Sequence, residues 1–351
     1  MQTQQNQSNN NKKSKTKWPV LLAVLLVVLA TLAVVLRQRS TPYQRHQGMA
    51  FGTAFHITYQ HGDDIAPLID AELAKIDQSL SIFNDSSTIS AVNNNRSLQS
   101  DDMLTEVFTL AQKVAEETGG AFDITVAPLV NAWGFGHAKR GQEPSAATID
   151  SLRQVIGYKK ISLKNSVFSK QDARVMLDCG AIAKGYACDI VARLMEEQKI
   201  KNYMIEIGGE VVTSGINPER MPWRIGVTVP TDDSLSQNQQ LQAVLNVTDK
   251  AMATSGNYRN FYYKNGRKFA HTIDPATGRP VQHNILSATV LADNCATADA
   301  YATSFMVMGL DKAKVILKKH PELMAYIIYS DEKGKNAVWY SPSVEEKIVK
   351  E

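Results

Sequence analysis

The chain lacks the features that mark several common classes of protein. Its 351 residues carry a formal net charge of only +3, and part of the lysine excess lies in residues 11–17. This balance gives no argument for nucleic acid as a partner, because binding to nucleic acid needs a concentrated positive surface. Neither the Walker pattern nor GxGxxG occurs, so a phosphate site would have to follow another pattern. The length allows one large domain or two.

Cysteine is also scarce. The three cysteines, Cys179, Cys188 and Cys295, form neither a CxxC pair nor a zinc-type spacing. An odd number cannot pair completely within one chain. We therefore expect all three to be small buried apolar residues.

One long uncharged run lies near the N-terminus. Residues 18–36 contain no charged residue, and at about 1.5 Å per residue they reach the thickness of a hydrocarbon core. Four lysines precede the run and only Arg37 and Arg39 follow it closely. The positive-inside bias then places the N-terminus in the cytoplasm and the rest of the chain outside it.

A cleaved signal peptide is the alternative for this run. The run is long for a signal peptide, and no small-x-small cleavage site follows it closely. We favour an uncleaved single-pass anchor in the cell inner membrane, with the folded domain on the periplasmic side.

The chain divides into four segments on composition. We expect a disordered cytoplasmic stub over 1–17, the transmembrane anchor over 18–36, a polar linker over 37–47 and a folded domain over 48–351. Strand-like and helix-like patterns mix in the domain without regular βαβ alternation, which predicts an α+β fold.

Local patterns place several elements in that domain. Residues 49–59 alternate like one strand, and residues 172–200 read as a strand, a turn of small residues and a long helix. Residues 259–274 predict a hairpin with Asn265-Gly266 at its turn.

Asp299 and Thr303 lie one helical turn apart in a run of small residues that predicts a helix. Two oxygen atoms on one helix face could form half of a cage for a hard cation. Alternatively, Thr303 could bond to the carbonyl of Asp299 while the carboxylate lies in solvent. The spacing alone favours this second interpretation.

Three other stretches could carry chemistry. Asp123 is isolated among apolar neighbours, so its burial would need partners, such as the polar edge of a ligand. Gly180 and Gly185 flank a helix start beside Lys184, an arrangement that suits an anion. His271 could act as a general base or contact a phosphate. Each stretch also has a structural interpretation: a packed turn, a helix start with a solvated lysine, and a structural histidine.

Taken together, these stretches resemble one family. The segments GGAFDITVAPLVNAWGFG (119–136), DCGAIAKGYACD (178–189), IGGE (207–210), SGNY (255–258), HTIDPATGRP (271–280) and ATADAYATS (296–304) occur in the order typical of the ApbE-type flavin transferases, the FAD:protein FMN transferases. The resemblance extends from about Met49 to Met308.

The resemblance implies a compact, T-fold-like α+β domain that binds FAD with Mg²⁺, transfers FMN to a threonine of an acceptor protein and releases AMP. Asp299 and Thr303 then belong to a magnesium site with the carbonyl of Ala181. His271 lies near the reacting phosphate as the candidate base, with Asp274 a weaker candidate. The residues that the resemblance places against FAD are Met49, Phe83, Ala121, Phe122, Asp123, Asp178, Lys184 and Ile273.

Two other functions remain open at this stage. A hydrolase could split FAD into FMN and AMP at the same metal site, and a carrier could bind flavin without chemistry. The acid, lysine and metal set argues against a carrier, since storing a flavin needs no phosphate-activating cation. Phe83 stands where the family often has tyrosine, which keeps a stacking surface but leaves the balance of transfer and hydrolysis open. Family precedent suggests a respiratory redox subunit as the acceptor.

Overall fold

The computed structural model describes residues 17–136, 143–230, 240–257, 261–264, 267–282 and 284–349. The chain forms two compact units, Met1–Tyr43 and Gln44–Glu351. In the first unit, helix α1 (Lys17–Ser40) contains the stretch Trp18–Leu36, which is long and apolar enough to cross a membrane. The expected linker 37–47 is shorter in the structure, because α1 reaches Ser40 and a strand begins at Tyr43. Residues 1–16 of the expected stub lie outside the described residues.

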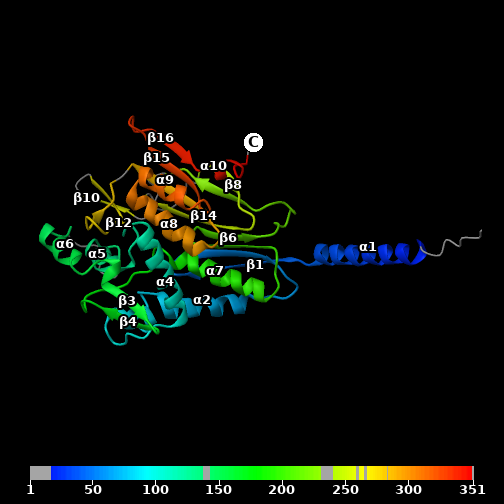
Figure 1. The fold of residues 1–351 in the computed structure, drawn as a ribbon, viewed down its shortest axis with the longest axis horizontal. Coiled ribbons are helices and arrows are strands. Elements are labelled where there is room, and N and C mark those ends of the chain that lie inside the picture. The colour runs from blue at the N-terminus through cyan, green and yellow to red at the C-terminus, as the bar shows by residue number, and fades with distance from the viewer. Residues whose placement is uncertain are drawn as a thin grey trace, which may run out of the picture. The chain divides into compact units, whose positions relative to one another are not determined.

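An eight-stranded sheet forms the centre of the second unit, with the order β1-β2-β5-β6-β9-β14-β15-β16 (Figure 1). The pairs from β2 to β16 are antiparallel. The strands are β1 (Tyr43–Ala50), β2 (Thr53–Gln60), β5 (Tyr203–Ile207), β6 (Glu210–Ser214), β9 (Lys250–Gly256), β14 (Ile285–Ala292), β15 (Met324–Ser330) and β16 (Asn336–Tyr340).

The first two strands correct the expectation of a single strand over 49–59. Phe51 and Gly52 both have positive φ, 52° and 73°. Two successive residues of this kind reverse the chain in a tight hairpin turn whose twist matches that of the flanking strands. The sequence therefore forms two neighbouring strands, β1 and β2, in place of one.

Both faces of strands β9, β14 and β15 are buried, and side chains alternate between the faces. In β9, Ala251 and Ala253 face one core while Met252 faces the other. In β14, Val290 and Leu291 divide in the same way. This alternation follows from the two-residue period of a strand, and it means that each face needs its own cover.

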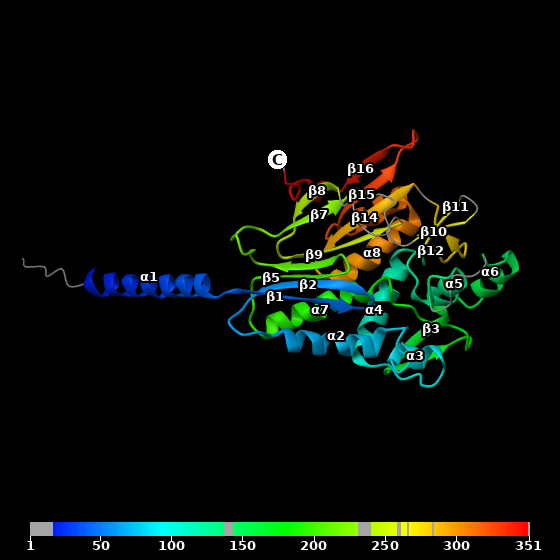
Figure 2. The same ribbon diagram turned by 180° about the vertical axis from the view of Figure 1, so that it is seen from behind.

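Helices cover the first face, as Figures 1 and 2 show from opposite sides. These helices contribute to the larger of the two hydrophobic cores, the one that contains Ala251 and Val290. The helices are α2 (Ala66–Leu80), α4 (Asp102–Glu117), α7 (Ala183–Glu197), α8 (Cys295–Met308) and α9 (Leu310–Lys319). The second face packs against the hairpin β7 (Arg224–Thr228) and β8 (Leu241–Asn246) and against α10 (Pro342–Glu345).

A smaller cluster lies beside this core. It joins Trp133 and Ile149 to Phe269 and Ile273. The elements of this region and of the neighbouring loops are α3 (Thr88–Asn93), η1 (Ile124–Val126), α5 (Ala127–Ala132), α6 (Ala146–Arg153), η2 (Tyr158–Lys160), β3 (Ile161–Lys164), β4 (Val167–Lys170), β10 (Phe261–Lys264), β11 (Arg267–Ala270), β12 (Ile273–Asp274) and β13 (Arg279–Pro280).

Other local predictions have mixed outcomes. The hairpin is confirmed by the antiparallel pairing of β10 with β11, although its expected turn, Asn265-Gly266, lies outside the described residues. The strand expected at the start of 172–200 is wrong: this stretch runs without strand structure into α7. The three cysteines are free and buried, as expected.

Helices α7 and α8 touch at their N-terminal ends. A Cβ on Gly185 would lie 2.4 Å from the carbonyl oxygen of Cys295, so only glycine fits there. One turn further along α7, the carboxylate of Asp189 accepts the amides of Cys295 and Ala296 at 2.7 and 2.9 Å. These amides belong to the first turn of α8, where backbone donors have no partner within the helix. The two helices are therefore fixed to each other.

This contact predicts the effect of Gly185→Ala. The added methyl group would push α8 away from α7, and we expect a loss of about 2 kcal/mol or more in the free energy of unfolding. Urea unfolding of the purified chain measures it. Gly62→Ala is the matched control, because a Cβ on Gly62 meets nothing within 4 Å. An equal and small effect of both changes would contradict the close contact.

Candidate functional site

The junction of α7 and α8 holds a cluster of three charged side chains. Lys184 Nζ lies 3.1 Å from Glu210 Oε1 and 3.9 Å from Asp299 Oδ2. Asp299 Oδ2 also accepts the amide of Gly185 at 3.1 Å. The two carboxylates are buried, with 2% of Asp299 and 3% of Glu210 exposed. A lysine from one helix thus joins a second helix to strand β6.

The charges in this cluster affect one another. Burial alone would lower the pKa of Lys184, but the carboxylates of Asp299 and Glu210 outweigh it and raise that pKa above its usual range. Burial raises the pKa of Asp299, against the opposing effects of the Lys184 ammonium and the Gly185 amide. Both pKa values are raised, which favours the charged form of Lys184 and the neutral form of Asp299, because the lysine has two opposite charges beside it and Asp299 has one. Lys184 is therefore a fixed cation at neutral pH.

The pair Asp299 and Thr303 occupies the face of α8 expected from their spacing. The Thr303 hydroxyl lies 3.0 Å from the hydroxyl of Ser255, at the end of β9. A hydroxyl bond to the carbonyl one turn back, of the kind considered for Thr303 and Asp299, is made by the next residue: Ser304 donates to the carbonyl of Ala300 at 2.7 Å. The alternative in which the Asp299 carboxylate lies in solvent is wrong, because the residue is buried.

The turn before α7 links two predicted stretches. Asp178 donates its amide to the carbonyl of Ile124 at 2.7 Å, and its Oδ1 accepts the amide of Gly180 at 2.8 Å. The bond to Gly180 closes the turn that carries Ala181. The start of the turn before α7 is therefore bonded to Ile124, although the two are far apart in sequence.

The carboxylate of Asp123 accepts hydrogen bonds from nearby groups of the same chain. Its Oδ1 accepts the amide and the hydroxyl of Thr125 at 2.8 and 2.7 Å, and its Oδ2 accepts the amide of Tyr158 at 2.8 Å. Burial raises its pKa, against these three hydrogen bonds. The structure thus gives Asp123 the role of a packed turn, beside buried Phe122 and half-buried Ala121. Its contact with FAD stays a prediction.

The loop that carries His271 is held by Trp133. The indole nitrogen of Trp133 donates to the carbonyl of Gly278 at 2.8 Å, and its ring stacks on Phe269 with centroids 5.6 Å apart. The His271 ring meets Phe135 edge to face at 6.4 Å. Ile273 is buried in the same cluster. Trp133 and Phe135 therefore pack against the segment 269–278 that carries His271.

Met49 and Phe83 are the exposed members of the predicted set. Met49, in β1, is 72% exposed, and Phe83, which follows α2, is 69% exposed. Side chains of this size are usually covered in a folded protein, so both offer an apolar surface to a flat ring.

Glu210 and Ser255 are the site residues that our sequence analysis missed. Both lie in segments that carried the family resemblance, IGGE and SGNY, but neither residue was given a role. A glutamate directly after two glycines, at the start of a buried strand, was the available signal, because a carboxylate there needs a cation.

The predicted magnesium ligands are oxygen donors, which suit a hard cation. Within the described ranges, no group of three or more His, Cys, Asp or Glu side chains could hold a metal ion. The predicted set instead has one carboxylate, one hydroxyl and one backbone carbonyl, and these are oxygen donors of the kind that Mg²⁺ takes when phosphates complete its shell. Both described contacts of the Asp299 carboxylate use Oδ2, which leaves Oδ1 for such a cation.

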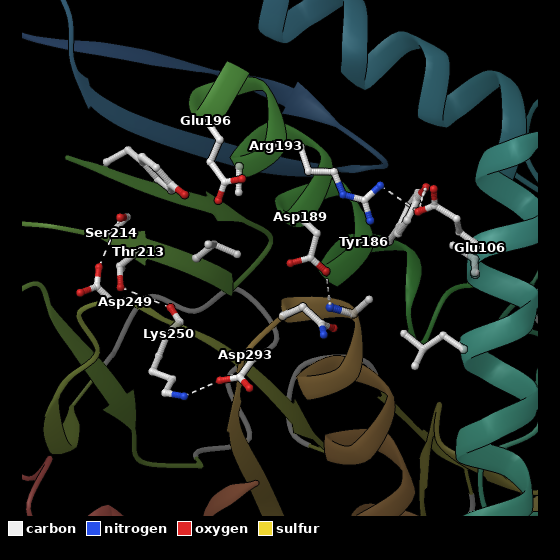
Figure 3. Close-up of a pocket in the computed structure, with 17 residues that line it drawn as sticks. Glu106, Tyr186, Asp189, Arg193, Glu196, Thr213, Ser214, Asp249, Lys250 and Asp293 are labelled. Atoms are coloured by element: carbon white, nitrogen blue, oxygen red, sulfur yellow. Dashed lines mark hydrogen bonds and ion pairs between the residues drawn. The ribbon is translucent and has the colours of Figure 1, made fainter. Parts of the chain in front are cut away.

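A separate cavity of about 510 Å³ lies beside the N-terminal end of α8, between α4, α7 and β6 (Figure 3). None of the predicted site residues lines it. Its charged groups largely pair with one another: Arg193 with Glu106 at 2.8 Å, and Lys250 with Asp293. Asp189, also on its wall, is occupied by the α8 amides. The cavity is therefore not the candidate site.

Comparison with known proteins identifies the family. A profile described as "ApbE family" matches residues 51–328. The chain belongs to the ApbE family. Among curated relatives, FAD:protein FMN transferase of Escherichia coli strain K12 is 32% identical over 348 residues, which cover 93% of this chain and 97% of the relative. The Vibrio cholerae protein of the same name is 33% identical over 318 residues, covering 88% and 94%.

Solved structures agree with this assignment. The flavin transferase ApbE from Vibrio cholerae superposes with a TM-score of 0.79 at 30% identity, over 88% of this chain and 99% of that one. The apo form of Pseudomonas stutzeri flavinyl transferase ApbE gives a TM-score of 0.76 at 27% identity, over 88% and 97%. The predicted family and the α+β fold are confirmed.

The buried cluster predicts that Lys184→Met destabilises the fold. Two buried carboxylates would lose their counter-charge, and we expect a loss of about 2 to 3 kcal/mol in the free energy of unfolding, because breaking a largely buried ion pair is costly. Lys250→Met is the control, since its partner Asp293 is 73% exposed and such a pair contributes less than about 1 kcal/mol. Urea unfolding at neutral pH compares them, and equal losses would refute the difference.

Proposed function

We propose that this chain transfers FMN from FAD to a threonine of an acceptor protein and releases AMP, in a Mg²⁺-dependent reaction. The relatives named FAD:protein FMN transferase, matched over nearly their whole length, support the reaction. The observation that carries the proposal is the junction of α7 and α8. There a fixed lysine cation, a buried carboxylate and a half-buried hydroxyl lie together on rigid elements.

The chain supplies the charge that the pyrophosphate of FAD needs. Lys184, a cation at the start of α7, would face the pyrophosphate beside the helix N-terminus. Asp299, Thr303 and the carbonyl of Ala181 would hold Mg²⁺. The metal would neutralise phosphate charge as the bond to AMP breaks. Ser255 fixes the direction of the Thr303 hydroxyl.

The acceptor threonine must lose its proton as its oxygen attacks the FMN phosphorus. His271 is the proposed base, with Asp274 a weaker candidate. The Trp133–Gly278 hydrogen bond and the Phe135 contact hold the loop of His271, and the histidine itself stays partly exposed. Asp274 Oδ1 accepts the amide of Ala276 at 2.8 Å, so this carboxylate has a structural role in the turn.

The flavin ring would lie on the exposed apolar side chains. Met49 and Phe83 offer surfaces for stacking, and the segment Ala121–Asp123 with Asp178 and Ile273 would form the remaining contacts. A phenylalanine at position 83 stacks as well as a tyrosine would, so the absence of a hydroxyl leaves this role intact.

The proposed acceptor is a respiratory redox subunit exposed on the periplasmic side of the inner membrane. The apolar length of α1 supports a single membrane anchor, and the lysines before it support the orientation. The catalytic domain would then work on the acceptor's side of the membrane.

The metal site predicts the effect of Asp299→Ala. When the chain is incubated with FAD, Mg²⁺ and a candidate acceptor domain, intact mass should show one FMN added to the acceptor, and Asp299→Ala should abolish this addition. A hard cation depends most on its charged ligand, so Thr303→Ala should keep partial activity. Chelator should mimic Asp299→Ala, and added Mg²⁺ should reverse the chelator.

Three outcomes would contradict this account. FMN and AMP released with no mass added to any acceptor would favour a hydrolase. Bound but intact FAD would favour a carrier. Wild-type transfer by Asp299→Ala, in a variant shown by circular dichroism to be folded, would remove the carboxylate from the site.

The anchor predicts a single retained span over residues 18–36. A reporter active only outside the cytoplasm should be active when fused to the C-terminus, and the purified protein should keep an N-terminus before residue 18. A reporter active only in the cytoplasm, or a mature N-terminus beyond residue 36, would overturn the anchor.

A further inference from the structure

The position of Lys184 raises a problem of competing cations. Its ammonium lies within 3.9 Å of the Asp299 carboxylate, the same group that the proposed function gives to Mg²⁺. A lysine that paired fully with Asp299 would exclude a divalent cation, because like charges at such a distance repel strongly in a buried site. Something must keep the lysine near Asp299 without letting it occupy that carboxylate.

Glu210 meets this requirement. The ammonium hydrogen-bonds to Glu210 at 3.1 Å, whereas its interaction with Asp299 is one of charge alone. With two carboxylates and one ammonium, the cluster keeps one negative charge in excess for a further cation. Lys184 hydrogen-bonds to Glu210 and only approaches Asp299, so the excess negative charge of the cluster is placed to serve a ligand of Asp299.

The surroundings hold Glu210 and the lysine stem in place. Glu210 follows the turn at Gly208 and Gly209, and that turn is closed by Glu206, whose Oε1 accepts the Gly209 amide at 2.6 Å. The other oxygen of Glu206 bonds to His56 on β2 at 2.8 Å. Gly208 lies so close to the lysine stem that a Cβ there would be 3.2 Å from Lys184 Cδ. The Gly208 backbone therefore restricts the conformation in which the Lys184 side chain reaches Glu210.

We propose that Glu210 is a positioning residue that holds Lys184 away from Asp299, so that the site accepts a divalent cation and keeps a lysine facing the phosphates. The inference rests on the proposed function for the identity of the cation site. Without Glu210, the ammonium moves to Asp299 and competes with the metal.

The test measures binding of Mn²⁺, a paramagnetic substitute for Mg²⁺, to the FAD-bound full chain by electron paramagnetic resonance of the free ion. Glu210→Gln should raise the Kd for Mn²⁺ at least tenfold. The double variant Glu210→Gln/Lys184→Met should recover to within about threefold of Lys184→Met alone, because the competing ammonium is gone. Glu72→Gln, which changes only a pair with Lys75 within α2, is the control and should leave the Kd unchanged.

Glu210→Asp separates positioning from a general effect of charge. It keeps the negative charge but shortens the side chain, so the hydrogen bond to Lys184 is lost and the Kd should rise about threefold or more. It also serves if Glu210→Gln does not fold. An unchanged Kd in Glu210→Asp, or an equal loss from Glu210→Gln with and without Lys184, would overturn the inference. If the wild-type chain bound no Mn²⁺, the proposed cation site itself would be wrong.

Discussion

Lys184 lies between the carboxylates of Glu210 and Asp299, and each of the three residues comes from a different element. The cluster can form only where α7, α8 and the start of β6 meet. Breaking this largely buried ion pair should cost about 2 to 3 kcal/mol, a large part of the stability of a domain. The same contact that places the charges for chemistry therefore also holds the elements together.

The fold provides this meeting point through two unusual approaches of the backbone. Gly185 allows the first turn of α7 to touch the first residue of α8, and Asp189 binds the amides of that same end. On the sheet side, Gly208 and Gly209 turn the chain from β5 to β6 against the lysine stem. A side chain at Gly185 or Gly208 would separate the groups that the site needs close together.

Part of the candidate site could be predicted from the sequence: the motifs that carry Lys184 and Asp299 were both singled out, and these two residues meet in the structure. The one-turn spacing of Asp299 and Thr303 also predicted their shared helix face, and the structure shows that they share it. The spacing could not decide between a buried and a solvated Asp299. The structure shows that Asp299 is buried beside Lys184, and no local sequence pattern can show such a contact. Glu210 escaped notice for the same reason, since its partner lies on a helix far from it in sequence. Where local preference and tertiary context differ, as at the Phe51–Gly52 turn and before α7, the sequence analysis was wrong.

The central claim is that a divalent cation and Lys184 share this junction without sharing a carboxylate. X-ray diffraction from crystals of the chain with FAD and Mn²⁺, recorded at the manganese absorption edge, tests it most directly. The account predicts an anomalous peak bound by the Asp299 carboxylate, the Thr303 hydroxyl and the Ala181 carbonyl, with the Lys184 ammonium still on Glu210. A peak elsewhere, or an ammonium paired with Asp299 while the metal is bound, would contradict it.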